Sequence, residues 1–449
     1  MNRTLRLTLI AALLVLSTVF LTTRPGAATI TIRADQTFQT MAGWEATSDL
    51  DQNPANPRWS AVADKALDLA ADIGINRIRI EVRAGAESRT GVISRYIAGE
   101  EGVEQFSAAR YVAQNDNEDP FVIDTSGFDF SELDWHMKGV VLPMKQRLEA
   151  KGERLWVNLC YVSFSPVRSF QMAPEEYAEL MLAVFQHLRD TFGLVPDSVE
   201  LILEPDNSKQ GWNGTNIGQA MVATANRLQE NGFAVPEFVA PSVMDMANAV
   251  TYLNGIIRVP GARPLIKEIS YHRYGAKSPR LLKGIADAAA GLGIRSSMTE
   301  LWFGAATYQV LMQDLTLANA SAFQGRVVHG LYVDPKGTAV QDLRLNEDVR
   351  YNAQFYRAIR MGAVRIGAET SDSGSFDPVA FVNPSGKQVV VVAATGAGTV
   401  TVEGLAAGAY ALSYAIDRRS DTLPDVALVA GAPLAVDMPG KGVLTIEGK

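Results

Sequence analysis

The chain has 449 residues, of which 47% are hydrophobic and 20% are charged, and its net charge is −8. This composition is typical of a soluble globular enzyme and excludes wholesale disorder, and the length suffices for one large domain and a smaller one. The acidic balance argues against nucleic acid or an anionic membrane surface as a partner.

The first 28 residues have the layout of a secretory signal peptide. Arg3 and Arg6 precede an apolar run over residues 7–21, and Gly26-Ala27-Ala28 offers a small-residue cleavage site. An uncleaved anchor is the alternative, because about eighteen mostly apolar residues could just span a bilayer. We expect cleavage, and therefore a secreted or periplasmic protein with no membrane contact beyond export. Without the three arginines of this segment, the chain has 38 basic and 49 acidic residues and a net charge of −11.

Cysteine and histidine usage gives no sign of a disulfide or a zinc site. Cys160 is the single cysteine, so no intrachain disulfide is possible and the fold relies on its core. The four histidines are scattered without zinc-ligand spacing. We expect a monomer with no cofactor and no metal, although a calcium ion bound by oxygen atoms would leave little trace in a sequence.

Residues 41–361 alternate short apolar runs with longer amphipathic stretches. The runs predict strands at 41–46, 75–82, 155–162, 199–204, 238–242, 268–272, 294–300 and 327–333. The stretches predict helices at 61–73, 133–151, 174–192, 216–231, 247–257, 279–292, 308–320 and 346–361. Eight such alternations indicate an α/β fold, a (β/α)₈ TIM barrel. A doubly wound open sheet would alternate similarly, but the first strand is not followed by a glycine-rich phosphate turn.

The sequence pattern changes in residues 362–449, where helical periodicity is lost. Short β-rich runs at 388–394, 399–402 and 410–415 are separated by turns rich in Gly, Pro and Ser. This pattern predicts a C-terminal all-β sandwich domain. Residues 29–40 are also strand-like and precede the barrel, so we expect them to join that domain.

Two glutamates fall where a barrel carries its chemistry, at the C-terminal ends of strands. Glu204 ends the fourth predicted strand and Glu300 ends the seventh. These strands lie across the barrel mouth from each other, so the two carboxyl groups can face one bond. Retaining glycoside hydrolysis needs such a pair about 5–5.5 Å apart. Other strand ends carry aromatic and hydrogen-bonding side chains, the mixture that sugars require.

Several motifs in order make the chain resemble the barrel clan of retaining glycoside hydrolases, clan A. Ile-Ser-Tyr-His-Arg-Tyr at 269–274 is similar to the strand-six His-x-Tyr, and Gly-Ile-Asn-Arg-Ile-Arg-Ile at 74–80 resembles the strand-two run ending in an arginine. Residues 38–44 and 351–367 resemble the opening segment and the barrel-to-sandwich passage of glycoside hydrolase family thirty. By this resemblance Glu204 is the acid/base and Glu300 the nucleophile, while Arg79 and Tyr274 support Glu300.

The resemblance implies a secreted retaining β-glycoside hydrolase that cleaves β-linked glycans or glycoconjugates through a covalent glycosyl-enzyme. We expect Glu204 to be protonated and Glu300 to be ionised at the working pH, because the charge of one carboxylate raises the pKa of the other and Arg79 favours ionisation of its neighbour. Six further residues are expected to bind substrate: His272, Trp302, Trp44, Asn158, Tyr161 and Asn207.

One position departs from the clan pattern. The asparagine that usually precedes the acid/base and binds the sugar 2-hydroxyl is replaced by Leu203. Asn158, Asn207 or Asp206 could supply a substitute, or the sugar could differ at carbon two. A third interpretation is that the enzyme is weakened or inactive. The alternative function is therefore a non-catalytic or weakly active carbohydrate-binding protein on the same barrel.

Overall fold

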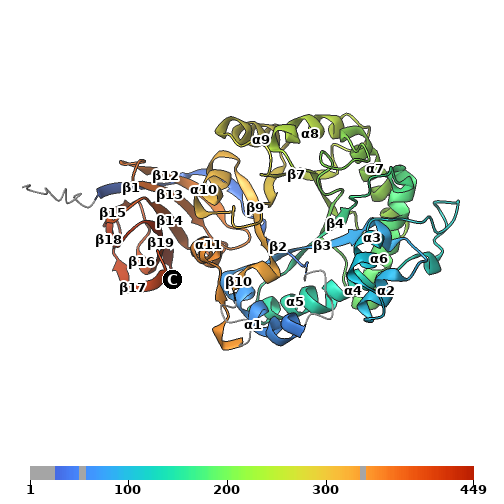
Figure 1. Cartoon of the computed structure of the whole chain (residues 1–449). Coiled ribbons are helices and arrows are strands. Elements are labelled where there is room, and N and C mark those ends of the chain that lie inside the picture. The colour runs from blue at the N-terminus through green and yellow to red at the C-terminus, as the bar shows by residue number, and fades with distance from the viewer. Residues whose placement is uncertain (1–25, 50–56, 334–339) are drawn as a thin grey trace, which may run out of the picture.

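The structure is a computed structural model that describes residues 26–49, 57–333 and 340–449. Eight parallel strands close into a barrel, and a second, β-rich domain lies beside it (Figure 1). The predicted fold class is therefore confirmed. The barrel strands are β2 (Gly43–Thr47), β3 (Arg77–Arg83), β4 (Trp156–Val162), β5 (Ser198–Glu200), β6 (Glu237–Val243), β7 (Ile266–His272), β8 (Arg295–Glu300) and β9 (Ala320–Val327).

Helices connect the barrel strands around the outside (Figure 1). They are α1 (Pro57–Ile73), α4 (Ser131–His136), α5 (Leu142–Ala150), α6 (Pro174–Phe192), α7 (Gly214–Glu230), α8 (Ala249–Ile257), α9 (Pro279–Leu292), α10 (Tyr308–Leu317) and α11 (Glu347–Ala358). Helix α9 shows why its bounds could be predicted. Ser278 caps the Leu281 amide, Pro279 opens the first turn, and Gly293 ends the helix at a φ of 69°. These signals are local, so the sequence reveals them.

The prediction for the eighth barrel strand is wrong. Residues 320–327 form β9, whereas residues 328–333 form a 3₁₀ turn and the two-residue strand β10 (Tyr332–Val333). Strand β9 begins with Ala320, Ser321 and Ala322, which have weak β propensity, so the pattern extended α10 over its start. Helix α10 instead ends at Leu317, and Asn319 turns the chain with a φ of 50°.

Residues 84–130 form an insertion between β3 and α4 that the sequence pattern did not predict. It contains α2 (Val92–Ile97) and α3 (Val103–Ala109), which pack on each other through stacked Tyr96 and Phe106 rings with centroids 4.1 Å apart. The helix predicted at 133–151 is also divided, because a π-helical turn (Met137–Val141) separates α4 from α5. Helices α2 and α3 are short, and the π-helical turn interrupts the pattern between α4 and α5. Neither region therefore has the long helical periodicity on which the prediction depended.

The barrel interior is polar because β3 alternates Arg with Ile or Val. Arg77 is fully buried and forms ion pairs with Glu45 of β2 and Glu268 of β7. Its guanidinium donates to both Glu268 oxygens, at 3.0 and 2.8 Å. Such bidentate pairing offsets much of the cost of burying charge. The polar interior joins strands from opposite sides of the barrel and lies beneath the strand ends.

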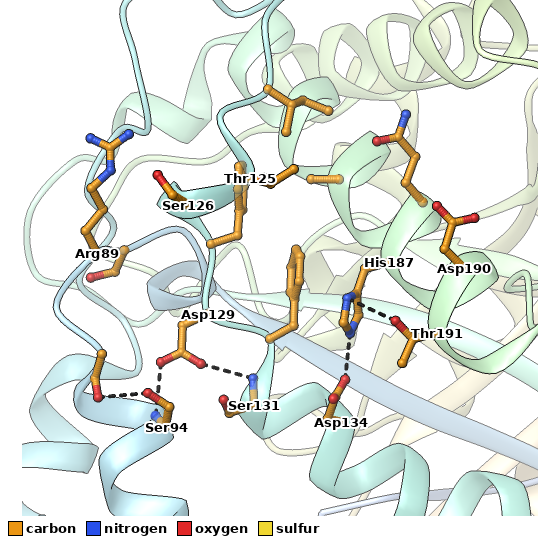
Figure 2. Close-up of a pocket in the computed structure, with 17 residues that line it drawn as sticks. Arg89, Ser94, Thr125, Ser126, Asp129, Ser131, Asp134, His187, Asp190 and Thr191 are labelled. Atoms are coloured by element: carbon orange, nitrogen blue, oxygen red, sulfur yellow. Dashed lines mark hydrogen bonds and ion pairs between the residues drawn. The ribbon is translucent and has the colours of Figure 1, made fainter.

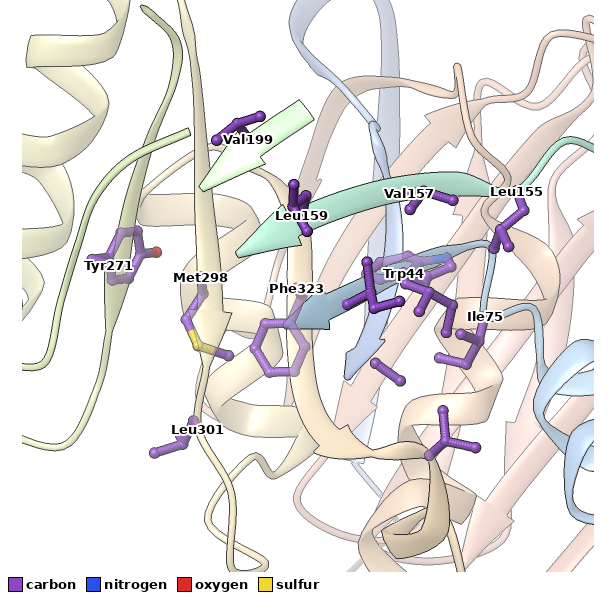
Figure 3. Packing of buried hydrophobic residues seen from close by; sticks show 14 of the residues in the cluster. Trp44, Ile75, Leu155, Val157, Leu159, Val199, Tyr271, Met298, Leu301 and Phe323 are labelled. Carbon is purple, nitrogen blue, oxygen red and sulfur yellow. The ribbon is translucent and has the colours of Figure 1, made fainter. Parts of the chain in front are cut away.

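Apolar side chains from the alternate strand positions fill the layer between barrel and helices (Figure 3). Trp44 belongs to this layer: it is fully buried, its ring lies 4.6 Å from that of Tyr356, and its Nε1 donates to the Ile359 carbonyl oxygen at 2.7 Å. Neighbouring strand residues point to opposite faces, so Glu45 points into the barrel while Trp44 points out of it. Trp44 therefore packs the barrel against α11.

The second domain is built on a nine-stranded sheet in the order β17-β16-β19-β14-β13-β12-β1-β15-β18. Its strands are β1 (Gly26–Thr40), β12 (Val364–Thr370), β13 (Phe376–Val382), β14 (Gln388–Ala394), β15 (Gly398–Glu403), β16 (Gly408–Ile416), β17 (Arg419–Leu428), β18 (Leu434–Met438) and β19 (Gly442–Gly448). Strand β1 pairs antiparallel with β12 and parallel with β15. The first described segment of the chain is thus an interior strand of the C-terminal domain.

The two domains share a core. Val389 and Val391 of β14 join the barrel's apolar cluster, whereas Val390 and Val392 belong to the core of the second domain. Strand β14 is therefore buried on both faces, which explains its uninterrupted valine run.

Residues 1–25, which carry most of the predicted signal peptide, lie outside the described residues. Within the described part, Gly26–Ala28 pair with Gly398–Val400. No helix among the described residues is long and apolar enough to cross a membrane.

Candidate active site

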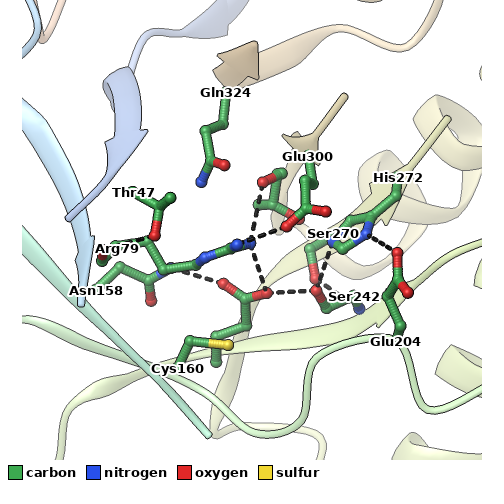
Figure 4. Close-up of polar contacts among 12 residues, drawn as sticks. Thr47, Arg79, Asn158, Cys160, Glu204, Ser242, Ser270, His272, Glu300 and Gln324 are labelled. Atoms are coloured by element: carbon green, nitrogen blue, oxygen red, sulfur yellow. Dashed lines mark hydrogen bonds and ion pairs between the residues drawn. The ribbon is translucent and has the colours of Figure 1, made fainter. Parts of the chain in front are cut away.

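Glu204 and Glu300 meet at the mouth of the barrel, together with His272 (Figure 4). One carboxylate oxygen from each glutamate and a ring nitrogen of His272 all lie within 4.8 Å of one another. Glu300 is the last residue of β8 and His272 the last of β7, and Glu204 follows β5 by four residues. The three side chains are at most 7% exposed. Parallel strand ends from three sides of the barrel therefore converge on one point.

Both oxygens of Glu300 accept hydrogen bonds. Arg79 donates to Oε2 at 2.5 Å, and the Tyr274 hydroxyl donates to Oε1 at 3.0 Å. The Tyr274 oxygen in turn accepts from the Trp302 amide at 3.0 Å, which orients the hydroxyl. Arg79 projects inward from β3 and is fully buried. Glu300 is thus fixed in one orientation by a cation and a phenol.

Glu204 is paired with His272. Its Oε1 lies 3.0 Å from His272 Nδ1, and its Oε2 accepts from Asn207 at 2.9 Å. Burial raises the pKa of Glu204, but the hydrogen bond and charge of His272, then Asn207 and Arg79, outweigh burial and leave the pKa below its ordinary value. Burial lowers the pKa of His272, but Glu300 and Glu204 outweigh it and raise that pKa. Both shifts favour a proton on His272 over one on Glu204, whereas the sequence predicts a protonated Glu204.

A buried chain of hydrogen bonds continues from His272 below the rim. His272 Nε2 lies 3.0 Å from the Ser242 hydroxyl, which also contacts Glu200. Glu200 is fully buried, and burial raises its pKa despite the nearby Arg79. The sequence analysis missed Glu200, although a glutamate inside an apolar strand is a signal that could have found it.

Three residues at the site have left-handed backbone. The φ angles are 49° at Glu204, 53° at Ser242 and 61° at Phe303. Non-glycine residues cost of order 1–3 kcal/mol in sparsely populated backbone regions and cluster at functional sites. At Ser242 the register between β6 and β7 also shifts, as at a β-bulge. The strained backbone re-aims the Glu204 and Ser242 side chains toward His272.

Three residues expected to bind substrate do not reach the rim. Trp44 packs under α11, as described above. Asn158 is fully buried, donating to Glu200 at 2.9 Å and accepting from Ser198 at 2.8 Å. Tyr161 is also fully buried and donates to Gln171 at 2.8 Å. Their hydrogen-bonding groups are satisfied inside the protein, so these three residues are corrected to structural positions.

The other expected residues lie at the site. His272, Tyr274 and Asn207 contact the two glutamates directly. Trp302 is partly buried, its Nε1 donates to Gln324 at 2.9 Å, and Arg79 lies 5.7 Å from the centre of its ring. Beside it, Phe303 is 86% exposed, with its ring centre 6.5 Å from that of Tyr274. Phe303 was missed because a single exposed aromatic in a loop carries no periodic pattern.

Leu203, the residue that departs from the clan pattern, lies in a small apolar cluster. It is 5% exposed and packs with Cys160 and Val162, and Tyr111 of the insertion covers the cluster. Of the proposed substitutes for the missing asparagine, Asp206 accepts from the Met244 and Asp245 amides and is thereby occupied. Asn207 is therefore the substitute that still faces Glu204.

A cavity of about 600 Å³ lies apart from this site, between the insertion and α6 (Figure 2). Asp134 and His187 line it, with Oδ1 and Nε2 2.6 Å apart, and Phe130 packs against the His187 ring. Its lining includes neither Glu204 nor Glu300. This cavity is therefore separate from the place at the barrel mouth where Glu204, His272 and Glu300 converge.

Among the residues that the structure describes, two groups of side chains have the spacing to hold a cation. The first is Glu204, His272 and Glu300, but the guanidinium of Arg79 already contacts Glu300 there and would repel a metal ion. The second is Glu87, Asp116 and Glu179, at the base of the insertion.

Comparison with known proteins finds a family match in the second domain. Residues 362–420 match the glycosyl hydrolase family 30 β-sandwich domain. No curated protein sequence matches the chain.

Solved structures with the family-30 architecture extend the likeness over the barrel. The catalytic domain of GH30 xylanase C from Talaromyces cellulolyticus has a TM-score of 0.71 at 18% identity, covering 94% of this chain and 100% of that one. A GH30 endoxylanase from Clostridium papyrosolvens has a TM-score of 0.64 at 16% identity, with 94% and 100% covered. An endo-β-1,6-glucanase has a TM-score of 0.64 at 15% identity, with 94% of each chain covered. At these identities the likeness is one of fold.

Proposed function

We propose that the protein is a secreted retaining β-glycoside hydrolase, with Glu300 as nucleophile and Glu204 as acid/base. The observation that carries this proposal is the pair of carboxylate oxygens within 4.8 Å at the barrel mouth. Retaining enzymes hold their carboxyl groups about 5–5.5 Å apart, whereas inverting enzymes need about 6.5–9.5 Å to admit a water molecule. The family-30 architecture supports a carbohydrate substrate.

In the first step Glu300 attacks the anomeric carbon and the bond to the leaving oxygen breaks. The leaving oxygen takes a proton from Glu204, which receives it from His272 across their 3.0 Å hydrogen bond. Arg79 and Tyr274 hold the Glu300 carboxylate in position for attack. The products of this step are a glycosyl ester on Glu300 and a free alcohol.

In the second step a water molecule replaces the alcohol. Its oxygen bonds to the anomeric carbon, the ester bond to Glu300 breaks, and its proton passes to Glu204 and His272. Two inversions give net retention, and the protein returns to its starting protonation state.

We propose a β-linked glycan or glycoconjugate as the substrate, because the structures with a similar fold are named xylanases and a glucanase. The apolar side chain of Leu203 cannot form a hydrogen bond with a sugar 2-hydroxyl. Asn207 would form that hydrogen bond instead, because its side chain lies beside the acid/base, 2.9 Å from Glu204.

Leu203 also favours a second candidate, a carbohydrate-binding protein with little or no turnover. Hydrogen bonds to the 2-hydroxyl supply several kcal/mol in the transition state, and losing them would slow catalysis far more than binding.

The test is Glu300→Gln, which removes the charge and keeps the shape. We expect turnover of aryl β-glycosides and β-linked polysaccharides to fall by several orders of magnitude with an unchanged melting temperature. Azide added to Glu300→Gly should restore activity and yield a product of inverted configuration. Near-wild-type turnover in Glu300→Gln would exclude Glu300 as nucleophile. Sugar binding without turnover in the wild-type protein would establish the second candidate.

A further inference from the structure

A second cluster of acidic side chains lies outside the active site, where the insertion meets the barrel. Glu87 follows β3 by four residues, Asp116 belongs to the insertion, and Glu179 lies on the inner face of α6. One carboxylate oxygen from each lies within 4.8 Å of the other two. The side chains are 1%, 3% and 1% exposed, respectively. Three carboxyl groups from three separate segments therefore meet in a buried space.

Several oxygens of this cluster have no hydrogen-bond partner within the described part of the chain. They are Asp116 Oδ1 and both oxygens of Glu179. The remaining oxygens are held by the protein. Asp116 Oδ2 accepts from the Asp124 amide at 2.6 Å, and Glu87 Oε2 accepts from Gln171 at 2.7 Å. Glu87 and Asp116 are thus held by the protein, and the unpartnered carboxylate of Glu179 lies beside them.

No basic side chain forms an ion pair with these three acids among the described residues. Two arginines lie nearby. Arg89 donates to the Asp116 carbonyl oxygen at 2.6 Å, but its ion pair is with Asp124. Arg227 donates to the Pro120 carbonyl oxygen at 2.8 Å and lies over the Phe121 ring. A fourth carboxylate, Glu176, has an oxygen with no partner in the described residues. A buried carboxylate without a counter-charge or hydrogen bonds costs several kcal/mol. The site therefore lacks a positive charge.

We propose that a calcium ion binds between Glu87, Asp116 and Glu179, with Glu176 as the nearest further carboxylate. Calcium takes six to eight oxygen ligands at 2.3–2.6 Å and accepts carboxylates in mono- or bidentate geometry. Magnesium retains most of its water and is seldom held by an all-protein cage, and zinc prefers nitrogen and sulfur ligands. An all-carboxylate cluster with both Glu179 oxygens free fits calcium best.

The bound ion would join the insertion to the barrel near the active-site rim. Gln171, which donates to Glu87, also donates to the Ala84 carbonyl oxygen at 3.2 Å and accepts from the Tyr161 hydroxyl at 2.8 Å. The insertion also supplies Tyr111, which covers Leu203 beside Glu204. A cation in the cluster would thus fix the segment that forms one wall of the rim.

The test uses full-length protein stripped with EGTA, titrated with calcium chloride by calorimetry and followed by thermal unfolding. We expect about one ion per chain and a rise in Tm of about 3 °C at calcium a hundredfold above its Kd. Glu179→Gln should abolish both responses. Glu175→Gln is the matched control, because it removes the same charge from the exposed side of the same helix and should respond like wild type.

Three outcomes would overturn the proposal. They are no heat and no Tm shift in the wild-type protein, an equal calcium response in Glu179→Gln, and a response to magnesium chloride alone. If Glu179→Gln fails to fold, Glu87→Gln takes its place, and the wild-type titration is decisive in either case.

Discussion

At the scale of single residues, the proposed mechanism depends on the pairing of His272 with Glu204. It contacts Glu204 through Nδ1 and the Ser242 hydroxyl through Nε2, and its pKa is raised above its ordinary value by Glu300 and Glu204, which outweigh burial. A raised pKa keeps the pair protonated to a higher pH than an isolated carboxylic acid would allow. The two side chains therefore titrate as one acid.

We predict that His272→Gln moves the upper limb of the pH profile of kcat/KM to lower pH. The variant leaves Glu204 alone as the acid. A carboxyl group that accepts a hydrogen bond from Asn207 and lies in the field of Arg79 loses its proton at a lower pH than the pair. Each pH unit above the acid's pKa lowers the protonated fraction about tenfold. Activity should thus fall far more at pH 7 than at pH 5, as measured with an aryl glycoside.

The control for this prediction is His187→Gln, which removes a histidine that pairs with Asp134 away from the site. It should leave the profile unchanged. A His272→Gln profile that keeps the wild-type shape, lowered equally at every pH, would assign His272 a structural role instead.

At the scale of elements, the loop between β8 and α10 presents an exposed aromatic side chain beside the candidate active site. Phe303 is 86% exposed and lies beside Trp302 and Tyr274, with ring centres 6.3 and 6.5 Å away. Its φ of 61° holds the ring out of the protein. An exposed aromatic in strained backbone next to catalytic groups is suited to stacking on a pyranose face.

We predict that Phe303→Ala raises KM about fivefold, the equivalent of roughly 1 kcal/mol of stacking, with kcat and Tm little changed. The exposed ring contributes little to the core, so stability should not depend on it. Phe303→Leu keeps apolar bulk without the aromatic face and should show a similar loss. Wild-type KM in Phe303→Ala would place the substrate elsewhere on the rim.

The elements also show what a sequence can predict. Helices α6 and α9 match their predicted bounds because proline, capping and terminal glycine are local signals. The small-residue strand β9 and the insertion were missed, because their conformation depends on tertiary packing.

Part of the candidate site could also be predicted from the sequence and part could not. The order of the barrel strands predicted that the same rim would carry Glu204, Glu300, Arg79, His272 and Tyr274, and the structure brings these five residues together. The position of Trp44 depends on strand register, since a shift of one residue exchanges the inner and outer faces. Register is set by pairing with β3 and β9, which the local sequence does not reveal.

At the scale of the whole molecule, the barrel and the second domain share one apolar core. Val389, Val391 and Phe381 pack into the barrel's apolar cluster, and Gln354 of α11 accepts hydrogen bonds from Ser413 and Thr445. Apolar side chains on both partners are covered by this contact, so neither surface suits exposure to water.

We therefore predict that truncation after Met361 gives insoluble barrel. Removal of residues 362–449 would expose α11 and the barrel face below it, and would leave β1 without β12 and β15. Sedimentation of the soluble fraction and residual glycosidase activity would measure the effect. A soluble fragment of residues 40–361 with full activity would show instead that the second domain is an independent appendage.

Strand β1 has a consequence for the order of folding. It lies between β12 and β15, and its contacts include a hydrogen bond from Thr29 to Ser371, 342 residues later in the chain. Closing so large a loop costs conformational entropy before any contact repays it, and topologies of this kind fold slowly. The ribosome synthesises β1 before the barrel and its partners β12 and β15 after it, so this interior strand stays unpaired until the barrel has been synthesised. The residues at its far end, from Arg33 to Thr37, are all exposed and keep that waiting segment polar.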